Sequence, residues 1–277
     1  MPLASNETET IFPSWQFDHW RAVDDRVRGG SSISHLDSIK LDQEYKVENQ
    51  LYDDAEKGGK AAARFWGNLD IDTLGGAGFA SQAYRYGPSP LKLPQLSYNG
   101  IAIHYQPDPK TKYTSSTPTN FTFVLKTTPT SNIPKHPKTP GPPREAQLTY
   151  EVSFPLFPNL NESNPGRKHV AIFEWKEFKA TYRGKNVPEG DEKWVPLDPG
   201  LIYELSIMCR SDFGKQHGDF GVVINSIEAV RKAKRVGMWI RLCDFWKGVT
   251  TWVSGLFSSS ENNIRLDDED EKQRLIV

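Results

Sequence analysis

The stretch Trp20-Arg-Ala-Val-Asp-Asp-Arg-Val-Arg-Gly-Gly-Ser-Ser32 combines a large aromatic side chain, two adjacent acids, a glycine pair and two hydroxyls. Gly29 and Gly30 let the backbone adopt a positive φ without a steric cost, which predicts a tight turn. The neighbouring carboxylates and hydroxyls can bond the amides that such a turn leaves free. Trp20 is large enough to anchor the stretch on a hydrophobic core.

A second glycine-rich stretch, Leu74-Gly-Gly-Ala-Gly-Phe-Ala-Ser-Gln82, is expected to lie beside the first. One interpretation is two tight turns between strands of an all-β domain, because glycine pairs are common at turns. The other is a pair of loops at one rim of a sandwich that contacts a ligand or partner. The candidate binding residues of these rim loops are Trp20, Asp24, Asp25, Gly29, Gly30, Ser31, Gly75, Gly76, Gly78 and Phe79.

The composition describes a folded domain with many polar loops. The chain has 277 residues, of which 37% are hydrophobic, with 20 prolines and 21 glycines. Its formal net charge of -1 gives no overall field that would attract nucleic acid. Cys209 and Cys243 are too few for a disulfide framework, so a reducing compartment is expected. The first residues show neither a signal peptide nor an Arg-rich transit peptide, and no stretch of 18 apolar residues occurs.

Alternation of apolar and polar residues predicts a series of strands bounded by turns. Asn120–Lys126 and Ile202–Arg210 alternate most regularly, and Asn99-Gly100 is expected to form a turn. Such strands at short spacing are typical of a β-sandwich or jelly roll. The predicted strands cover residues 32–42, 60–69, 96–105, 120–126, 147–154, 168–175, 202–210 and 219–227.

The domain organisation follows from changes in composition. We expect a disordered lead over 1–14, a β-sandwich over 15–230, an amphipathic aromatic helix over 231–258 and an acidic tail over 259–277. A proline-rich insert within the sandwich, residues 127–144, is expected to be extended or disordered, because proline cannot donate to a sheet ladder. Glu228–Lys234 is compatible with a helical entry to the aromatic segment.

The aromatic segment has apolar residues at helical spacing, with polar residues opposite. Three interpretations remain open: a helix packed on the domain, a helix lying in the plane of a membrane surface, and a helix docked into another protein. The candidate membrane or partner residues are Trp239, Leu242, Phe245, Trp246, Trp252, Val253 and Phe257.

No motif in the sequence supports catalysis, a cofactor or a metal. Gly75-Gly-Ala-Gly78 lacks the spacing and the strand–helix context of a dinucleotide-binding loop. Asp24 and Asp25 are neighbours in a turn, where capping is the more common role. No Cys/His spacing suits zinc. We therefore expect a protein that is not an enzyme and that needs no cofactor.

Several blocks occur in an order that resembles the complex I intermediate-associated protein 30 family. This resemblance implies a jelly-roll sandwich like that of galactose-binding domains. It also implies a non-enzymatic assembly factor for mitochondrial respiratory complex I, acting on the matrix side of the inner membrane on complex I subunits or assembly intermediates. The blocks are Trp20–Ser32, Ala63–Leu69, Gly75–Ser81, Tyr98–Ile101, Phe178 with Arg183-Gly184, and Gly218–Ile227.

Two alternatives to the assembly factor remain. Jelly rolls of this type often bind sugars, so a glycan- or small-ligand-binding module is one alternative. The other is a cytoplasmic, peripheral membrane adaptor outside mitochondria, which the aromatic segment and the lack of a visible transit peptide favour.

Overall fold

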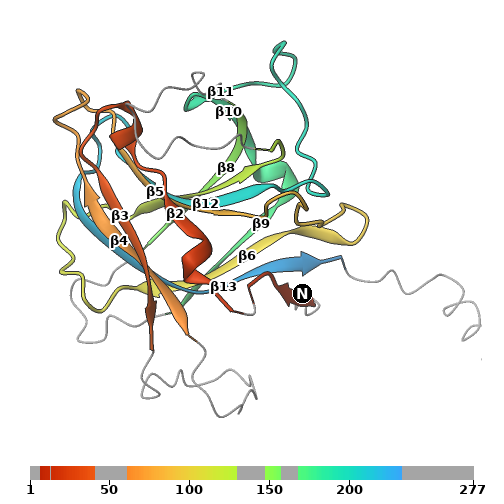
Figure 1. Ribbon diagram of the computed structural model, residues 1–277, viewed down its shortest axis with the longest axis horizontal. Coiled ribbons are helices and arrows are strands. Elements are labelled where there is room, and N and C mark those ends of the chain that lie inside the picture. Colours follow the sequence, from red (N-terminus) through yellow and green to blue (C-terminus); the bar gives the residue numbers. More distant parts are fainter. Residues whose placement is uncertain (1–6, 13, 41–60, 130–146, 157–167, 233–277) are drawn as a thin grey trace, which may run out of the picture. The chain divides into compact units, whose positions relative to one another are not determined.

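The computed structural model describes residues 7–12, 14–40, 61–129, 147–156 and 168–232, and shows two antiparallel sheets packed face to face (Figure 1). Sheet A has the order β3 (Ile33–Ile39), β4 (Ala62–Leu69), β13 (Gly218–Arg231), β6 (Tyr98–Pro107) and β9 (His169–Glu174), and β1 (Thr8–Thr10) pairs with β13. Sheet B has the order β11 (Lys185–Asn186), β10 (Lys179–Tyr182), β8 (Leu148–Pro155), β7 (Asn120–Lys126), β12 (Glu204–Arg210), β5 (Phe79–Arg85) and β2 (Trp20–Ala22). The predicted all-β sandwich is confirmed.

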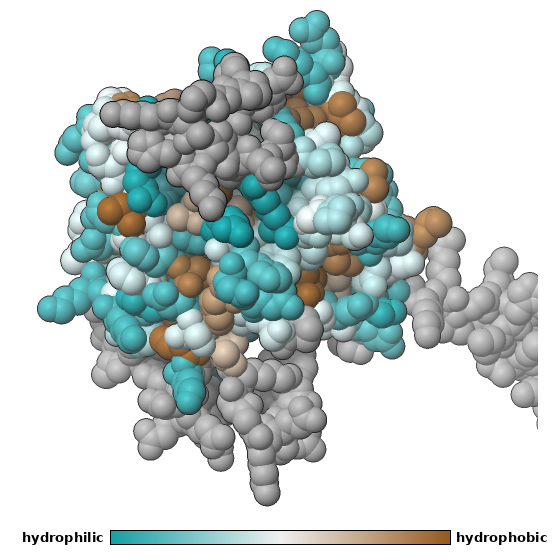
Figure 2. Space-filling model, in the orientation of Figure 1, coloured by the Kyte–Doolittle hydropathy of each residue, from teal (hydrophilic) through white to brown (hydrophobic). Residues whose placement is uncertain are grey.

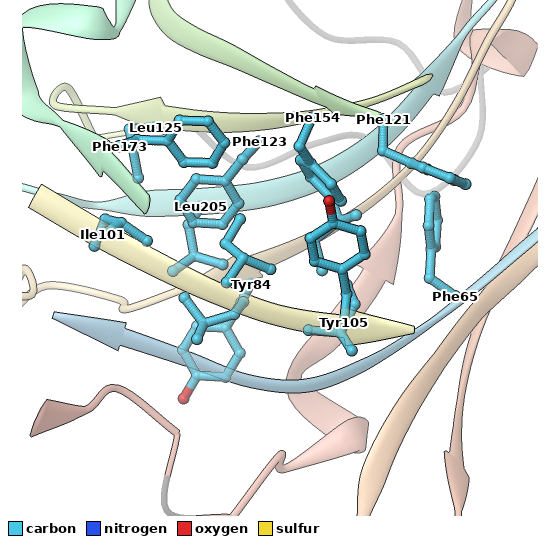
Figure 3. Close-up of a cluster of buried hydrophobic side chains, with 14 of the residues drawn as sticks. Phe65, Tyr84, Ile101, Tyr105, Phe121, Phe123, Leu125, Phe154, Phe173 and Leu205 are labelled. Atoms are coloured by element: carbon cyan, nitrogen blue, oxygen red, sulfur yellow. The ribbon is translucent and has the colours of Figure 1, made fainter. Parts of the chain in front are cut away.

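The core lies between the sheets and follows from the alternation in the strands. On β7, Phe121, Phe123 and Leu125 are buried, and on the neighbouring β12 so are Leu205 and Ile207. Because successive side chains of a strand point to opposite faces, each strand contributes every second residue to the core. Figure 3 shows aromatic side chains of the two sheets meeting: Phe121 of β7 lies beside Phe65 of β4, and Phe154 of β8 lies beside Tyr105 of β6.

β13 is the longest strand and connects the two halves of sheet A. Its first half pairs with β4, and most of its length pairs with β6. The register shifts between Ile224 and Ser226, so the buried residues change from even positions such as Val222 to odd positions such as Ile227. This bulge lets one strand keep its apolar side chains in the core along 14 residues.

The N-terminal region differs from the expected disordered lead over 1–14. Thr8–Thr10 form β1 and pair with the end of β13, and Ile11 donates a backbone hydrogen bond to Ile227. Phe12 is buried in the core. The sequence of β1, Thr-Glu-Thr, is polar and exposed, so only its pairing with a distant strand identifies it.

Two local predictions about sheet A were wrong. Asn99-Gly100 lies inside β6 and does not form a turn; a Cβ on Gly100 would lie 1.8 Å from the carbonyl oxygen of Phe173 in β9, so the glycine permits close strand packing. Glu228–Arg231 continue β13 rather than starting a helix, because they pair with β6 on one side and β1 on the other.

Some elements were not predicted, and some predictions cannot be compared with the structure. The short strands β1, β2, β10 and β11 were missed, as were β5 and the 3-10 helix η3 (Trp175–Glu177). Two more 3-10 helices, η1 (Phe17–His19) and η2 (Asp25–Arg28), lie on either side of β2. The proposed aromatic helix, the acidic tail and the proline-rich insert beyond Pro129 lie outside the described residues.

Candidate functional site

Asp24 joins three strands at one end of the sandwich. It is almost fully buried and lies two residues after the end of β2. Its carboxylate accepts hydrogen bonds from the backbone N–H and hydroxyl of Ser34 in β3 and from the backbone N–H of Ser81 in β5, and it pairs with Arg26 at 2.8 Å. The carboxylate makes no capping bond to η2, so it holds the two sheets together instead.

Asp25 makes the corresponding connection one residue further along. Its carboxylate accepts hydrogen bonds from the backbone N–H of Ser32 at 3.0 Å, from the Ser32 hydroxyl at 2.6 Å and from the backbone N–H of Phe79 at 3.2 Å. A Cβ on Gly30 would lie 2.4 Å from this carboxylate, and one on Gly78 would lie 2.0 Å from the carbonyl oxygen of Asp70. The second glycine of the first pair and the last of the second stretch are therefore required by close packing.

The two glycine-rich stretches do lie side by side. Asp25 bonds the start of β5, and the Ser31 hydroxyl lies 3.0 Å from that of Thr73. A third loop, which follows β12, joins them through Ser211: its hydroxyl donates to the Gly76 carbonyl and accepts from the Gly78 N–H. We call residues 24–31, 70–78 and 211–217 the rim loops.

The positive φ expected of the first glycine-rich turn occurs at one of its two glycines. Gly29 has φ 88°, Gly75 has φ 61° and Gly76 has φ 94°, and no heavy atom lies within 3.4 Å of where their side chains would be. These three glycines supply the positive φ that the turns need, whereas the Asp24 and Asp25 carboxylates accept hydrogen bonds from the backbone amides nearby. Among the candidate residues, Gly29, Ser31 and Gly75 are exposed, and Gly30, Gly76 and Phe79 are half-buried.

Trp20 is placed away from the rim surface. It lies in β2 with its indole buried against Phe12, Trp15 and Tyr84, at centroid distances between 5.5 and 5.8 Å. Its Nε1 donates to the Trp15 carbonyl at 2.9 Å. Trp20 therefore anchors the N-terminal region on the core, as its size predicted, and is not available to a ligand.

The third rim loop presents an apolar side chain that the sequence did not indicate. Phe213 is 88% exposed and has φ 60°, next to Asp212 with φ 46°. Left-handed backbone is uncommon for a bulky residue, so the surrounding structure must impose it. Gln216 does so: its amide bonds backbone groups of Asn120 and Arg210, and the Asn120 side chain donates to Asp212.

The first rim loop also carries exposed groups. Val27 of η2 is exposed, and the Arg28 guanidinium lies 5.4 Å from the centre of the Phe79 ring. On the face in view in Figure 2, apolar residues form separate patches among hydrophilic ones. The rim therefore offers single apolar side chains on a rigid frame.

Charged pairs cover part of the outer face of sheet B. Glu204 is buried and pairs with Lys126 and with Arg85, and Arg210 pairs with Glu151. Burial alone would raise the pKa of Glu204, but the Lys126 and Arg85 cations outweigh it and the pKa lies below its usual range. Two buried donor atoms here, Arg85 Nη2 and Arg210 Nε, have no acceptor among the described residues. The sequence had not indicated this group of charges.

The outer face of sheet A carries a second polar group. Asp108 is buried, and its carboxylate accepts a hydrogen bond from Arg64 at 2.9 Å. Its backbone N–H donates to the Tyr113 hydroxyl at 2.7 Å. Arg64 also lies 4.5 Å from the centre of the Trp66 ring, and His35 stacks on Trp66 at 4.4 Å. With two neighbours on its ring, Trp66 is not a free stacking platform.

The described ranges contain no group of three or more His, Cys, Asp or Glu side chains that could hold a metal ion. Within the same ranges, no helix is long and apolar enough to cross a membrane. Cys209 lies in the core, where burial raises the pKa of its thiol well above the usual value. A buried neutral thiol acts as a small apolar residue.

Comparisons with known proteins agree with the motif blocks. The family model described as complex I intermediate-associated protein 30 matches residues 8–224. The chain is also 36% identical over 220 residues to the uncharacterized protein C9E9.15 of Schizosaccharomyces pombe. This match covers 79% of this chain and 81% of that protein. The matched region includes all three rim loops and nearly the whole sandwich.

Proposed function

Because the chain belongs to the complex I intermediate-associated protein 30 family, we propose that it acts as a non-enzymatic assembly factor that holds subunits or intermediates of respiratory complex I. The match over residues 8–224 is the observation that carries this proposal. The two buried acids near the rim, Asp24 and Asp25, are consistent with a binding role. Their carboxylate oxygens already accept hydrogen bonds from backbone amides, hydroxyls and Arg26, so they hold the loops in place.

The client contacts the rim loops in this proposal. Exposed aromatic side chains on a rigid frame are typical centres of protein interfaces, because little conformational entropy is lost on binding. Phe213 fits this description, and Val27 is a second exposed apolar residue on the same loops. A Cβ on Gly76 would lie 3.9 Å from the carbonyl carbon of Phe213, so the glycine leaves the approach to Phe213 free of a neighbouring side chain.

The place of action in this proposal is the matrix side of the mitochondrial inner membrane. The aromatic residues between Trp239 and Phe257 would supply contact with the membrane surface or with a membrane-embedded client. Imaging of the tagged full-length protein in living cells tests the compartment. A cytoplasmic signal would favour the peripheral membrane adaptor outside mitochondria.

The function is tested by removing the protein from cells and measuring assembled complex I by native gel electrophoresis. We expect complex I to fall and smaller intermediates to accumulate, and the wild-type gene to restore both. The Phe213→Ser variant should restore complex I poorly. The matched control is Leu96→Ser. Leu96 is exposed and lies just before β6, near the point where Tyr98 pairs with Arg231.

Unchanged complex I in cells lacking the protein would remove the proposal. Full rescue by Phe213→Ser would keep the assembly role but move the client contact away from the rim.

A second candidate function is binding of a sugar or another small oxygen-rich ligand on the outer face of sheet B. The unpartnered Arg85 Nη2 and Arg210 Nε favour it, because hydroxyl or carboxylate oxygens would supply their acceptors. A glycan array with the purified protein, repeated with Arg85→Ala, tests this. An array without hits would exclude glycans as the ligand.

A further inference from the structure

The strand β9 is an unprotected edge of sheet A. Natural sheets guard their edges with very short strands, prolines, bulges or charged side chains. In sheet B the end strands β11 and β2 have two and three residues. At the other end of sheet A, β3 carries His35 and Asp37 on its outer face. β9 has six residues, none of them proline, and pairs only with β6 among the described strands (Figure 1).

The outward side of β9 is apolar in its centre. Phe173 and Ala171 face the core, so the alternate residues face outward. Val170 is 52% exposed and Ile172 is 59% exposed, and both are β-branched residues that favour strands. On the β6 side of the strand, Val170 pairs with His104 and Ile172 pairs with Ala102. No described strand pairs with the opposite side of β9. An apolar, regular edge of this kind is a template for another strand.

The ends of this outward row carry opposite charges. Lys168, directly before β9, and Glu174, its last residue, are both exposed. Read along the strand, the outward residues are therefore a cation, two β-branched residues and an anion. Reversing the direction exchanges the charges and leaves the centre apolar. An antiparallel copy of the same row is thus complementary to it in both charge and apolarity.

We propose that two copies of this protein pair β9 against β9 in an antiparallel dimer. Ala171 of each copy lies opposite Ala171 of the other, on the two-fold axis. Each Val170 then faces Ile172 of the second copy, and each Lys168 faces Glu174 of the second copy. The interface is isologous, so every such pair occurs twice. The two sheets A become one continuous sheet across the dimer.

No other antiparallel register of β9 on β9 matches both the apolar residues and the opposite charges. A slip of one residue places the apolar row opposite core-facing residues, because side chains alternate with a period of two. A slip of two residues places Val170 opposite Glu174, or Lys168 opposite Ile172, and leaves charges without partners. Glu174 now pairs with Lys176 at 2.7 Å, but both side chains are exposed, so the carboxylate can exchange this partner readily.

The dimer is tested by sedimentation of the full-length protein over a range of concentrations. A strand pair of six residues is a small interface, so the wild type should dimerise weakly and with clear concentration dependence. Lys168→Glu and Glu174→Lys each place like charges opposite one another twice and should raise the dimer dissociation constant about tenfold. Mixing these two variants should restore dimers, because the mixed pair again has opposite charges at both positions.

The mixing step separates pairing from folding defects, because Glu174→Lys also removes a side chain that caps η3. Both variants should keep the thermal unfolding midpoint of the wild type to within a few degrees. The control Val27→Glu, at an exposed apolar residue of η2, should dimerise as the wild type does. A wild type that stays monomeric at its highest soluble concentration, or variants that fail to pair on mixing, would overturn the proposal.

Discussion

Asp25 shows how a single buried carboxylate holds the rim loops together. It is fully buried and accepts three hydrogen bonds, two from Ser32 and one from the backbone of Phe79. Asp25→Ala leaves these donors without an acceptor and should lower the free energy of unfolding by about 3 kcal/mol. Urea denaturation measures this. Asp72→Ala, at an exposed acid on the neighbouring rim loop, should change stability by less than about 0.5 kcal/mol.

Gly29 and Gly30 are adjacent but serve different purposes. Gly29 has φ 88° and free space around it, so Gly29→Ala should cost about 1 kcal/mol of backbone strain. Gly30 has no positive φ, yet its Cβ would overlap the Asp25 carboxylate at 2.4 Å. Gly30→Ala should therefore cost about 3 kcal/mol, because the buried network must move. Equal losses in urea denaturation would contradict this distinction.

The sequence predicted part of the rim and missed the rest for a physical reason. Glycine pairs and adjacent acids have strong local preferences, so their turn and their hydrogen bonding could be anticipated. The identity of their partners could not, since Ser34 and Ser81 lie in distant strands. Phe213 is a lone aromatic in a polar turn, and its exposure depends on Gln216 and on no pattern in its neighbours.

At the scale of strands, the contact between β1 and β13 involves a titratable side chain, Glu228, which pairs with His104. Glu228 of β13 receives hydrogen bonds from His104, Thr8 and Ser226, which lower the pKa of its carboxyl to about 2 although burial opposes the shift. An unfolded Glu has a pKa of about 4.3, so this carboxylate stabilises the folded state above that pH. Its contribution is lost as the pH falls from about 4.3 towards 2.

We therefore predict a stability difference between wild type and Glu228→Gln that is full near pH 6 and shrinks below pH 4. Urea denaturation at both pH values measures it. The matched control is Glu177→Gln, at an acid of η3 outside sheet A. A difference that stays constant between pH 6 and pH 3 would show that the Glu228 carboxyl is not held in its charged form.

The predicted strands succeeded where large apolar residues recur at every second position and failed where they do not. β7 matches its predicted range of 120–126, because Phe121, Phe123 and Leu125 recur with this period. β5 is buried to the same extent as β7, but small and polar residues fill its centre, so its sequence has no such period to detect. The polar β1 has no buried face, and only its pairing with β13 determines its structure.

At the scale of the whole molecule, the described sandwich contains its own core and ends at Lys232. The buried residues between the sheets come from strands that precede this point, and the last backbone bond of the sheet joins the Lys232 N–H to the Ser97 carbonyl. The contacts of the sandwich form one compact unit that ends at Lys232. A protein that stops at Lys232 should therefore fold by itself.

Removing residues 233–277 separates two interpretations of the aromatic segment, a helix packed on the domain and a helix at a membrane surface. A helix that packs on the domain would stabilise it, so its removal would lower the thermal unfolding midpoint. A helix that serves a membrane surface would leave the midpoint unchanged while its removal abolishes binding to liposomes. We predict this second result, measured by circular dichroism and by flotation of the full-length and shortened proteins.

The matched variant for this test keeps the full length and changes Trp239, Trp246 and Trp252 to alanine. Interfacial tryptophans contribute much of the affinity of an in-plane helix, so this variant should float poorly while retaining the wild-type midpoint. Equal flotation of the variant and the wild type would exclude the membrane surface. Loss of flotation together with a lower midpoint would instead indicate a helix whose aromatic face stabilises the sandwich.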